Sequence, residues 1–406
     1  MHAEASLFSN DLIGNAPLRP ARALCMAVGA SLLLAACGPT ATTKARMAAP
    51  ATPVESDTLT APLGEGSGKI ALILPLTQGG NASSVGQSLR NAAELAAAET
   101  GGGHLTLIVK DDRSTPDGAR QATQAALAEG AELIVGPLYA PNVREVGRIA
   151  RAANRPVIGF STDTGAAAQG VYLLSFLIET YVDRVIDYAV SRDKKSFAAL
   201  VPESDYGNVA LAEFQEIAAK RGLRVVAIER YGAGNAGAAI ARLSANARQI
   251  DALFIPEQAE AMAQIAGLLS ANGLDGKRVQ ILGTGLWNDA RVLSLPGLQG
   301  AWFAAPDNGG FNAFAGRYRE KYGTEPTRIA TLAYDAVSLA GALARSQSAQ
   351  KFSNDVLTNS SGFNGTDGVF RFRADGLNER ALSILGIANG STNVVNPAAR
   401  TFGSGA

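Results

Sequence analysis

The stretch KIALILPL at residues 69–76 decides the fold, because it is apolar almost throughout and similar runs recur along the chain. Runs of the same kind follow as HLTLIVKD (104–111), AELIVGPL (131–138) and RPVIGFST (155–162). Strands that are buried on both faces of a parallel sheet read as continuous apolar runs, whereas strands with one wet face alternate. Each run therefore predicts a buried parallel strand.

A second series of apolar runs follows at regular intervals. The runs are SFAALVPE (196–203), RVVAIERY (224–231), DALFIPEQ (251–258) and VQILGTG (279–285), and their starts are spaced by 28, 27 and 28 residues. This spacing is typical of a strand, a helix and the next parallel strand. Between the runs, periodicity predicts helices at 85–99, 117–129, 142–153, 206–221 and 257–272. The sequence therefore predicts an α/β fold with two doubly wound, Rossmann-like lobes.

The chain continues beyond the second series and must return to one or both lobes. The run AWFAAPD (301–307) predicts another strand, and helices are expected at 311–322 and 328–344. Asp375 and Gly376 form a turn signal that predicts a hairpin over 368–388, joining VFRFR to ALSILGIA.

The N-terminal segment is typical of an export signal. Arg19 and Arg22 precede an apolar run at 23–36, which is shorter than the ~20 residues needed to span a bilayer. The run ends in LAACG, which resembles the lipobox of bacterial lipoproteins, so we predict a signal peptide at 1–36 and acylation of Cys37. A plain secretory signal is the alternative. Residues 37–68 are rich in Ala, Thr, Pro, Ser and Gly, which indicates a flexible tether.

Composition excludes several classes of function. The 36 basic and 36 acidic residues leave no net charge, and no basic stripe is present, so we expect no nucleic-acid partner. Both cysteines, Cys25 and Cys37, precede the folded body, and His104 is its single histidine. We therefore expect no catalytic nucleophile and base, no metal site and no cofactor, and we predict that the protein is not an enzyme.

An ordered set of motifs resembles the type I periplasmic binding proteins, the superfamily of the leucine/isoleucine/valine-binding protein. The motifs are IALILPLTQGG, KDD at 110–112, IVGPL, RPVIGFST, SDYGNVALAEF, DALFIPE, LGTGLWND, FAGRYREKYGTEPT and GTDGVFRF. The resemblance implies one domain at 69–390, in which three segments cross between two lobes and a ligand binds in the cleft. Lobe one would take 69–181 and 306–345, lobe two 183–305 and 352–390, and 391–406 would be a C-terminal tail.

The resemblance also implies candidate ligand-binding residues. Ser161 and Thr162 would donate to a ligand carboxylate, Tyr206 would line the cleft from lobe two, and Glu257 would accept the ammonium of an amino acid; each could instead serve as a helix cap or turn residue. The loop PLYAPN (137–142) departs from the family pattern because it lacks a serine or threonine cluster, and Asp163 stands where a neutral hydroxyl is expected. Tyr139, Asn142, Asp163, Asp205 and Asp289 would suit a polyhydroxylated or cationic ligand, or a cleft that is retained from an ancestor and no longer used.

Two functions are compatible with this resemblance. One is solute recognition for an ABC-type transporter, with an amino acid or a similar small polar molecule as the ligand and an ABC permease as the partner. The other is suggested by QGVYLLSFLIETYVDRVIDYA (169–189), which looks like the penicillin-binding protein activators, lipoproteins that stimulate a peptidoglycan synthase. In both cases the protein would lie in the periplasm and contact the inner or outer membrane through its lipid anchor only.

Overall fold

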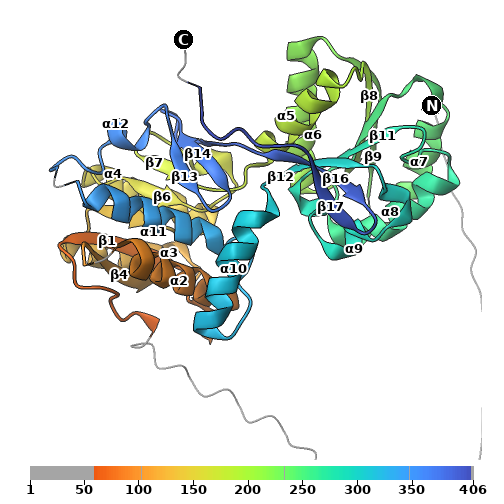
Figure 1. The fold of residues 1–406 in the computed structure, drawn as a ribbon. Coiled ribbons are helices and arrows are strands. Elements are labelled where there is room, and N and C mark those ends of the chain that lie inside the picture. The colour runs from red at the N-terminus through yellow and green to blue at the C-terminus, as the bar shows by residue number, and fades with distance from the viewer. Residues whose placement is uncertain (1–58, 102, 233, 347, 404–406) are drawn as a thin grey trace, which may run out of the picture. The chain divides into compact units, whose positions relative to one another are not determined.

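The structure is a computed structural model that describes residues 59–101, 103–232, 234–346 and 348–403 (Figure 1). The predicted signal peptide, the predicted acylation site Cys37 and most of the predicted tether lie outside these residues. Within the described ranges, no helix is both long enough and apolar enough to cross a membrane.

Lobe one is built on five parallel strands in the order β4-β1-β5-β6-β7. They are β1 (Gly68–Leu74), β4 (Leu105–Asp111), β5 (Leu133–Val135), β6 (Val157–Gly159) and β7 (Val171–Leu173). Side chains of β1 alternate between two cores: Ile70, Leu72 and Leu74 pack on one face of the sheet, and Ala71 and Ile73 on the other. The strand predictions from the first apolar series are confirmed.

Helices cover both faces of this sheet. On one side lie α2 (Ser84–Ala96), α10 (Asn308–Tyr322) and α11 (Ala330–Ala344), and on the other lie α3 (Pro116–Ala128) and α4 (Ala140–Ala152). Local chemistry explains where α2 and α3 begin. The hydroxyl of Ser83 accepts from the amide of Gly86 (3.1 Å), and that of Thr115 accepts from the amide of Gly118 (3.0 Å), so each side chain caps a helix N-terminus.

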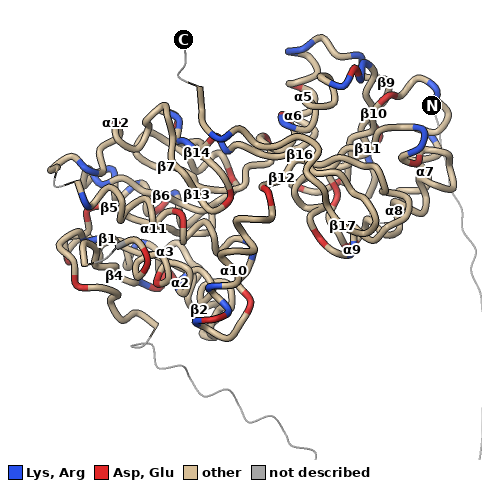
Figure 2. Tube along the Cα trace, viewed as in Figure 1, with Lys and Arg blue, Asp and Glu red and all other residues tan. Residues whose placement is uncertain are grey.

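Lobe two has a seven-stranded sheet in the order β17-β16-β12-β11-β10-β8-β9. Its parallel strands are β8 (Ser196–Pro202), β9 (Arg224–Tyr231), β10 (Ala252–Phe254), β11 (Gln280–Gly283) and β12 (Trp302–Ala305). Two antiparallel strands, β16 (Ser383–Ala388) and β17 (Ser391–Asn396), extend the sheet beyond β12. Acidic and basic residues are spread over both lobes (Figure 2). One face packs on α5 (Ile178–Ser191) and α6 (Asp205–Arg221), and the other on α7 (Ala236–Ser244), α8 (Ala259–Ala271) and α9 (Ala290–Leu293).

Several short elements complete the chain. They are β2 (Thr77–Gln78), β3 (Asn81–Ala82), the π-helix η1 (Ala97–Gly101), the 3-10 turns η2 (Thr164–Ala166), η3 (Ala247–Gln249), η4 (Gly285–Trp287) and η5 (Pro296–Leu298), α12 (Asn354–Leu357), β13 (Phe363–Gly365), β14 (Gly368–Phe372) and β15 (Asn378–Arg380).

The chain passes between the lobes three times, as the resemblance implies. The first crossing lies at 174–177, between β7 and α5; the second at 306–307, between β12 and α10; and the third at 381–382, between β15 and β16. The first crossing precedes the predicted boundary by a few residues, because Ile178 and Tyr181 already pack in the core of lobe two.

The C-terminal part differs from its prediction. Residues 352–380 belong to lobe one and not to lobe two, because Phe352, Phe370 and Phe372 are buried in the lobe-one core. The turn before β15 is present, and Gly376 adopts φ 90° there. However, β14 pairs with the short strand β15, whereas the run ALSILGIA crosses to lobe two as β16. The predicted hairpin is therefore wrong in its second strand.

The folded body also extends beyond both of its predicted boundaries. Strand β17 lies within the segment that was expected to be a tail, and it pairs with β16. On the N-terminal side, Leu63 exchanges two backbone hydrogen bonds with Leu107 of β4 (3.1 and 2.8 Å), and Leu63 packs against the core. Ordered structure thus begins before Lys69, because the free edge of β4 offers backbone partners.

Candidate functional site

The candidate site is formed by the loops that follow the carboxyl ends of the parallel strands, where ligands bind in open α/β sheets. Every predicted ligand residue lies in one of these loops or in the first turn of the next helix: Tyr139, Asn142, Ser161, Thr162 and Asp163 in lobe one, and Tyr206 and Glu257 in lobe two. Their hydrogen bonds show which polar groups are already engaged by the protein.

Ser161 and Thr162 follow β6 directly. Ser161 is buried, and its Oγ accepts from the amide of Asp163 (3.0 Å), which leaves its own O–H able to donate. Thr162 is exposed. Asp163 accepts from the amide of Gly165 (2.9 Å) and forms an ion pair with Arg144 of α4. Arg144 therefore offsets the negative charge that the sequence places beside the two hydroxyls.

Tyr139 and Asn142 lie at the start of α4 and differ in what they contact. Tyr139 is the N-cap residue of α4, is partly exposed, and makes no side-chain cap hydrogen bond. Asn142 is buried, and its Nδ2 donates to Oδ2 of Asp112 (2.8 Å). Asn142 thus supports the turn after β4, and its predicted contact with a ligand stays a prediction.

Asp112 is a buried carboxyl that the sequence did not single out as a site residue. Its Oδ1 accepts from the amide of Ser114 (2.8 Å), but burial outweighs this bond and the one from Asn142 and raises its pKa to about 6. The neighbouring Asp111 is engaged by the amides of Leu76 and Thr77 (3.0 and 3.1 Å). Both carboxyls therefore hold turns together at the edge of the site.

The raised pKa of Asp112 predicts a measurable pH dependence. Because the folded protein holds this proton more tightly than the unfolded chain, the buried carboxylate destabilises the fold above pH 6, and this destabilisation is relieved as pH falls toward 3.8. We expect Asp112→Asn to gain about 2 kcal/mol relative to the wild type between pH 4 and pH 7. Urea unfolding at several pH values measures the difference. The exposed Asp117→Asn is the control, and a difference that does not vary with pH for Asp112→Asn contradicts the prediction.

Tyr206 and Glu257 come from lobe two. The Tyr206 hydroxyl donates to Oγ1 of the buried Thr284 (2.8 Å), and burial raises its pKa. Glu257 is buried; one oxygen accepts from the hydroxyl of Tyr231 and the other from the amide of Gln258 (2.6 Å). Its role as an ammonium partner stays a prediction, and a ligand would have to compete with two protein donors.

A cluster beside the crossing segments was missed by sequence reasoning. The guanidinium of Arg328 lies between the rings of Phe176 (4.9 Å) and Phe311 (4.7 Å) and makes two hydrogen bonds to the fully buried Asp367 (3.0 and 2.6 Å). Tyr181 of α5 is buried within the electrostatic reach of Arg328, and its pKa is raised by burial. No motif signals this cluster, because its members are far apart in sequence.

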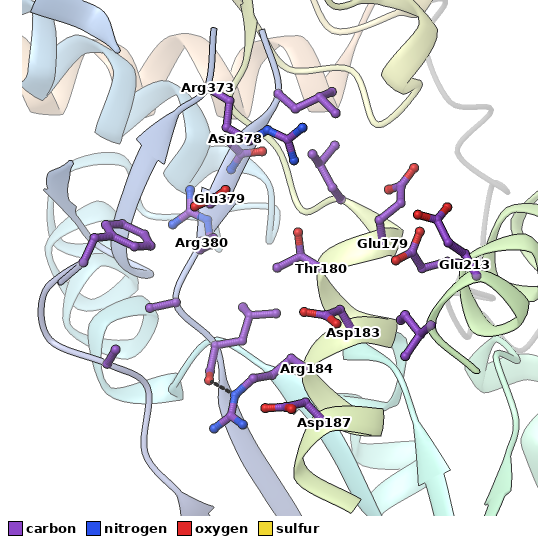
Figure 3. A pocket seen from close by; sticks show the side chains of 18 of the residues that line it. Glu179, Thr180, Asp183, Arg184, Asp187, Glu213, Arg373, Asn378, Glu379 and Arg380 are labelled. Atoms are coloured by element: carbon purple, nitrogen blue, oxygen red, sulfur yellow. Dashed lines mark hydrogen bonds between the residues drawn. The ribbon is translucent and has the colours of Figure 1, made fainter. Parts of the chain in front are cut away.

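A pocket of about 900 Å³ lies on another side of the crossing segments, between α5, α6, β15 and residues 396–402 (Figure 3). On α5 the carboxylates of Glu179, Asp183 and Asp187 recur every four residues along one helix face. Arg221 pairs with Asp183 (3.3 Å) and Asp187 (2.5 Å). The pocket is thus acidic at one end and charge-balanced at the other.

The acidic end of this pocket includes Glu213 of α6, whose pKa is raised to about 7, mainly by burial and then by nearby carboxylates. None of the predicted ligand residues lines the pocket. Among the residues that the structure describes, no three His, Cys, Asp or Glu side chains are arranged to hold a metal ion.

The solved structures that resemble this chain share its fold. A protein ascribed to a branched-chain amino acid ABC transporter of Rhodospirillum rubrum has 20% identity and a TM-score of 0.71, with 80% of this chain and 99% of that chain covered. A leucine-binding protein of Thermotoga maritima has 21% identity and a TM-score of 0.56, with 83% and 99% covered. An ABC transporter solute-binding protein of Rhodopseudomonas palustris, in complex with 3,4-dihydroxybenzoic acid, has 21% identity and a TM-score of 0.56, with 82% and 96% covered.

At these identities the structures establish the fold alone, and no curated protein matches the sequence. A family model described as "Periplasmic binding protein" matches residues 67–392, which is most of the chain and contains both lobes and all three crossings. The prediction of a binding protein that is not an enzyme is thereby confirmed. This chain belongs to the periplasmic binding protein family and has the type I fold of its solute-binding members.

Proposed function

We propose that this protein recognises a small polar solute, an amino acid or a related acid, at the loops after the parallel strands and delivers it to an ABC permease. We further propose that acylated Cys37 anchors it to a membrane on the periplasmic side. The family membership supports solute binding, and the similar structures are described as parts of ABC transporters.

The observation that carries this proposal is the burial and hydrogen bonding of the Ser161 hydroxyl. Its buried hydroxyl is oriented by the amide of Asp163, its proton is free to be donated, and it stands at the carboxyl end of β6. A buried donor of this kind stabilises a ligand carboxylate, because hydrogen bonds to charged groups are roughly twice as strong as neutral ones. The ion pair of Asp163 with Arg144 reduces the repulsion that a bare carboxylate would exert there.

The engagement of Glu257 bears on the ligand class. An α-amino acid needs an acidic partner for its ammonium, and the oxygens of Glu257 already accept from Tyr231 and Gln258. Exposed carboxylates remain at Glu203 and Asp205 after β8. A carboxylic acid without an ammonium group would need no acidic partner. One similar structure holds such an acid, 3,4-dihydroxybenzoic acid. A ligand screen should therefore contain both classes.

We expect calorimetric titration of the full-length chain with the common L-amino acids, their amides, benzoate and 3,4-dihydroxybenzoate to detect at least one binder. Ser161→Ala should weaken that binding about tenfold, because a charge-assisted hydrogen bond is lost. Ser196→Ala is a matched control: its hydroxyl is also buried and also accepts from a backbone amide, that of Asp251 (3.2 Å), but at the amino end of β8. No binding by any compound, or equal losses in both variants, would refute the proposal.

A peptidoglycan synthase is the alternative partner. The observation that favours it is the loop after β5, where residues 137–142 offer no serine or threonine hydroxyl to a ligand and Tyr139 occupies the cap position. Crosslinking of the anchored protein in cells, followed by mass spectrometry, decides between the partners. Recovery of a permease supports delivery to a transporter, whereas recovery of a synthase without a permease replaces it with synthase activation.

A further inference from the structure

Five side chains beside the crossing segments form a column in which rings and guanidinium groups alternate: Phe311, Arg328, Phe176, Arg380 and Phe370. The guanidinium of Arg328 lies 4.7 and 4.9 Å from the ring centroids of Phe311 and Phe176, and that of Arg380 lies 5.2 and 5.3 Å from those of Phe176 and Phe370. Each contact is within the range of a cation–π interaction.

The column draws the three crossings together. Phe176 is part of the first crossing, Phe311 lies in the first turn of α10 directly after the second, and Arg380 is the last residue of β15 before the third. A change in the third crossing is therefore passed directly to Arg380, whose neighbour in the column, Phe176, belongs to the first.

The two arginines of the column have different partners. Arg328 is fully paired, because both of its terminal nitrogens donate to Asp367, which also accepts from the hydroxyl of Thr331 (2.5 Å). Arg380 faces Asp335 at 3.8 Å, with side chains only 2% and 1% exposed. All three nitrogens of the Arg380 guanidinium and Oδ2 of Asp335 are buried without a hydrogen-bond partner.

An incomplete buried pair is unfavourable, because desolvated charges are compensated only when their geometry allows hydrogen bonds. The electrostatics agree with this description: burial raises the pKa of Asp335 to about 6, and the opposing effects of Arg380 and of the amide of Thr366 do not cancel it. The structure thus contains a pair of opposite charges that are close but not bonded.

Asp335 is held in place by the backbone at residues 365–366. Oδ1 of Asp335 accepts from the amide of Thr366 (2.7 Å), and Oδ2 lies against Gly365, where an added Cβ would be only 2.5 Å away. The segment 377–382 that carries Arg380 borders the pocket of about 900 Å³ (Figure 3). A shift of about 1 Å would bring the two groups to the distance of a charge-assisted hydrogen bond.

We propose that Arg380 and Asp335 form a latch. The two side chains make no hydrogen bond in the structure, and the bond between them forms when the third crossing shifts as the lobes close on a solute. This inference rests on the proposed function, because the solute supplies the free energy for closure. Arg380 would act as a positioning residue: it contacts no solute, yet the closed arrangement is favoured by the bond that it completes.

The test is the double variant Arg380→Met/Asp335→Asn in the full-length chain, which removes both charges and keeps similar volumes. Since the pair makes no hydrogen bond in the structure, and Asp335→Asn alone keeps the ring contacts of Arg380, we expect the thermal midpoint of this single variant without solute to be unchanged or raised. We expect at least a tenfold loss of affinity for the tightest binder among L-leucine, L-isoleucine, benzoate and 3,4-dihydroxybenzoate. The control is Arg371→Met/Glu379→Gln, a partly exposed ion pair between β14 and β15 that should change neither quantity.

The outcomes separate the two proposals. Absence of binding to the wild-type chain refutes the proposed function. If the wild-type chain binds a probe and the double variant binds it equally well, the latch is refuted while the proposed function stands. A clearly lowered midpoint of Asp335→Asn alone, measured without solute, also refutes the latch, because this variant keeps the ring contacts of Arg380 and its loss would show that the pair already stabilises the protein before a solute binds.

Discussion

Replacement of Arg328 by alanine is expected to lower the free energy of unfolding by about 3 to 5 kcal/mol. The reason is the fate of Asp367, whose side chain is fully buried and whose two oxygens both accept hydrogen bonds from Arg328 (2.6 and 3.0 Å). Without Arg328 the carboxylate would remain in the interior with a hydrogen bond from the hydroxyl of Thr331 and without its hydrogen-bonded cation. Guanidinium unfolding followed by circular dichroism measures the loss.

The control for this prediction is Arg371→Ala. Arg371 pairs with Glu379 on the neighbouring strand, but their side chains are 28% and 38% exposed, so the loss should stay below about 1 kcal/mol. Similar losses for the two variants would show that burial does not set the strength of the Arg328 pair. Arg328→Lys should fall between them, since a lysine keeps the charge and cannot donate from two nitrogens in one plane.

Two glycines of α10 are expected to respond to alanine in opposite directions. A Cβ on Gly310 would lie 1.8 Å from the carbonyl oxygen of Thr366, so the backbone that carries Asp367 would have to move. We expect Gly310→Ala to cost about 3 kcal/mol, at the upper end of the usual range for overpacking. A Cβ on Gly316 would meet nothing within 4 Å, and alanine there should stabilise the helix by about 0.5–1 kcal/mol.

Thermal unfolding of the two variants under identical conditions provides the measurement. Both substitutions add the same methyl group to the same helix, so their effects on helix propensity largely cancel. The difference in stability between the two variants therefore measures the cost of the close approach of residues 365–367 to Gly310. A Gly310→Ala variant as stable as the wild type would mean that this loop yields freely, which would also weaken the argument that Asp335 is held in place beside it.

Most strands of the two apolar series could be predicted because their burial follows from the local sequence, whereas β7 and β17 were not predicted. Runs such as KIALILPL have no polar face, and a strand without a polar face must be covered on both sides. The C-terminal hairpin could not be predicted in the same way. Asp375 and Gly376 do make a turn. However, ALSILGIA does not pair with the strand before this turn, because it pairs instead with the free edge of β12. An available sheet edge is a property of the assembled lobe.

For the candidate site, too, some features follow from local sequence and others only from the assembled structure. Its residues could be placed after strands β5, β6, β8 and β10 from the apolar runs alone, since parallel strands end at a common edge. Which of their groups are free could not be predicted, because the partners come from other segments. Arg144 forms an ion pair with Asp163, and the hydroxyl of Tyr231 donates to Glu257, and no spacing in the sequence relates these pairs.

The sequence by itself determined the two α/β lobes, the position of the loops that follow their parallel strands and the absence of cysteine from the body of the protein, since these follow from short-range periodicity and from composition. Only the tertiary structure decided that residues 352–380 join lobe one, that Glu257 is already bonded, and that the three crossings meet in a column of rings and guanidinium groups. Such contacts depend on burial among residues that lie far apart in the sequence, such as Phe176 and Arg380, because the free energy of a charge or hydrogen bond is set by its surroundings and not by its neighbours in the chain.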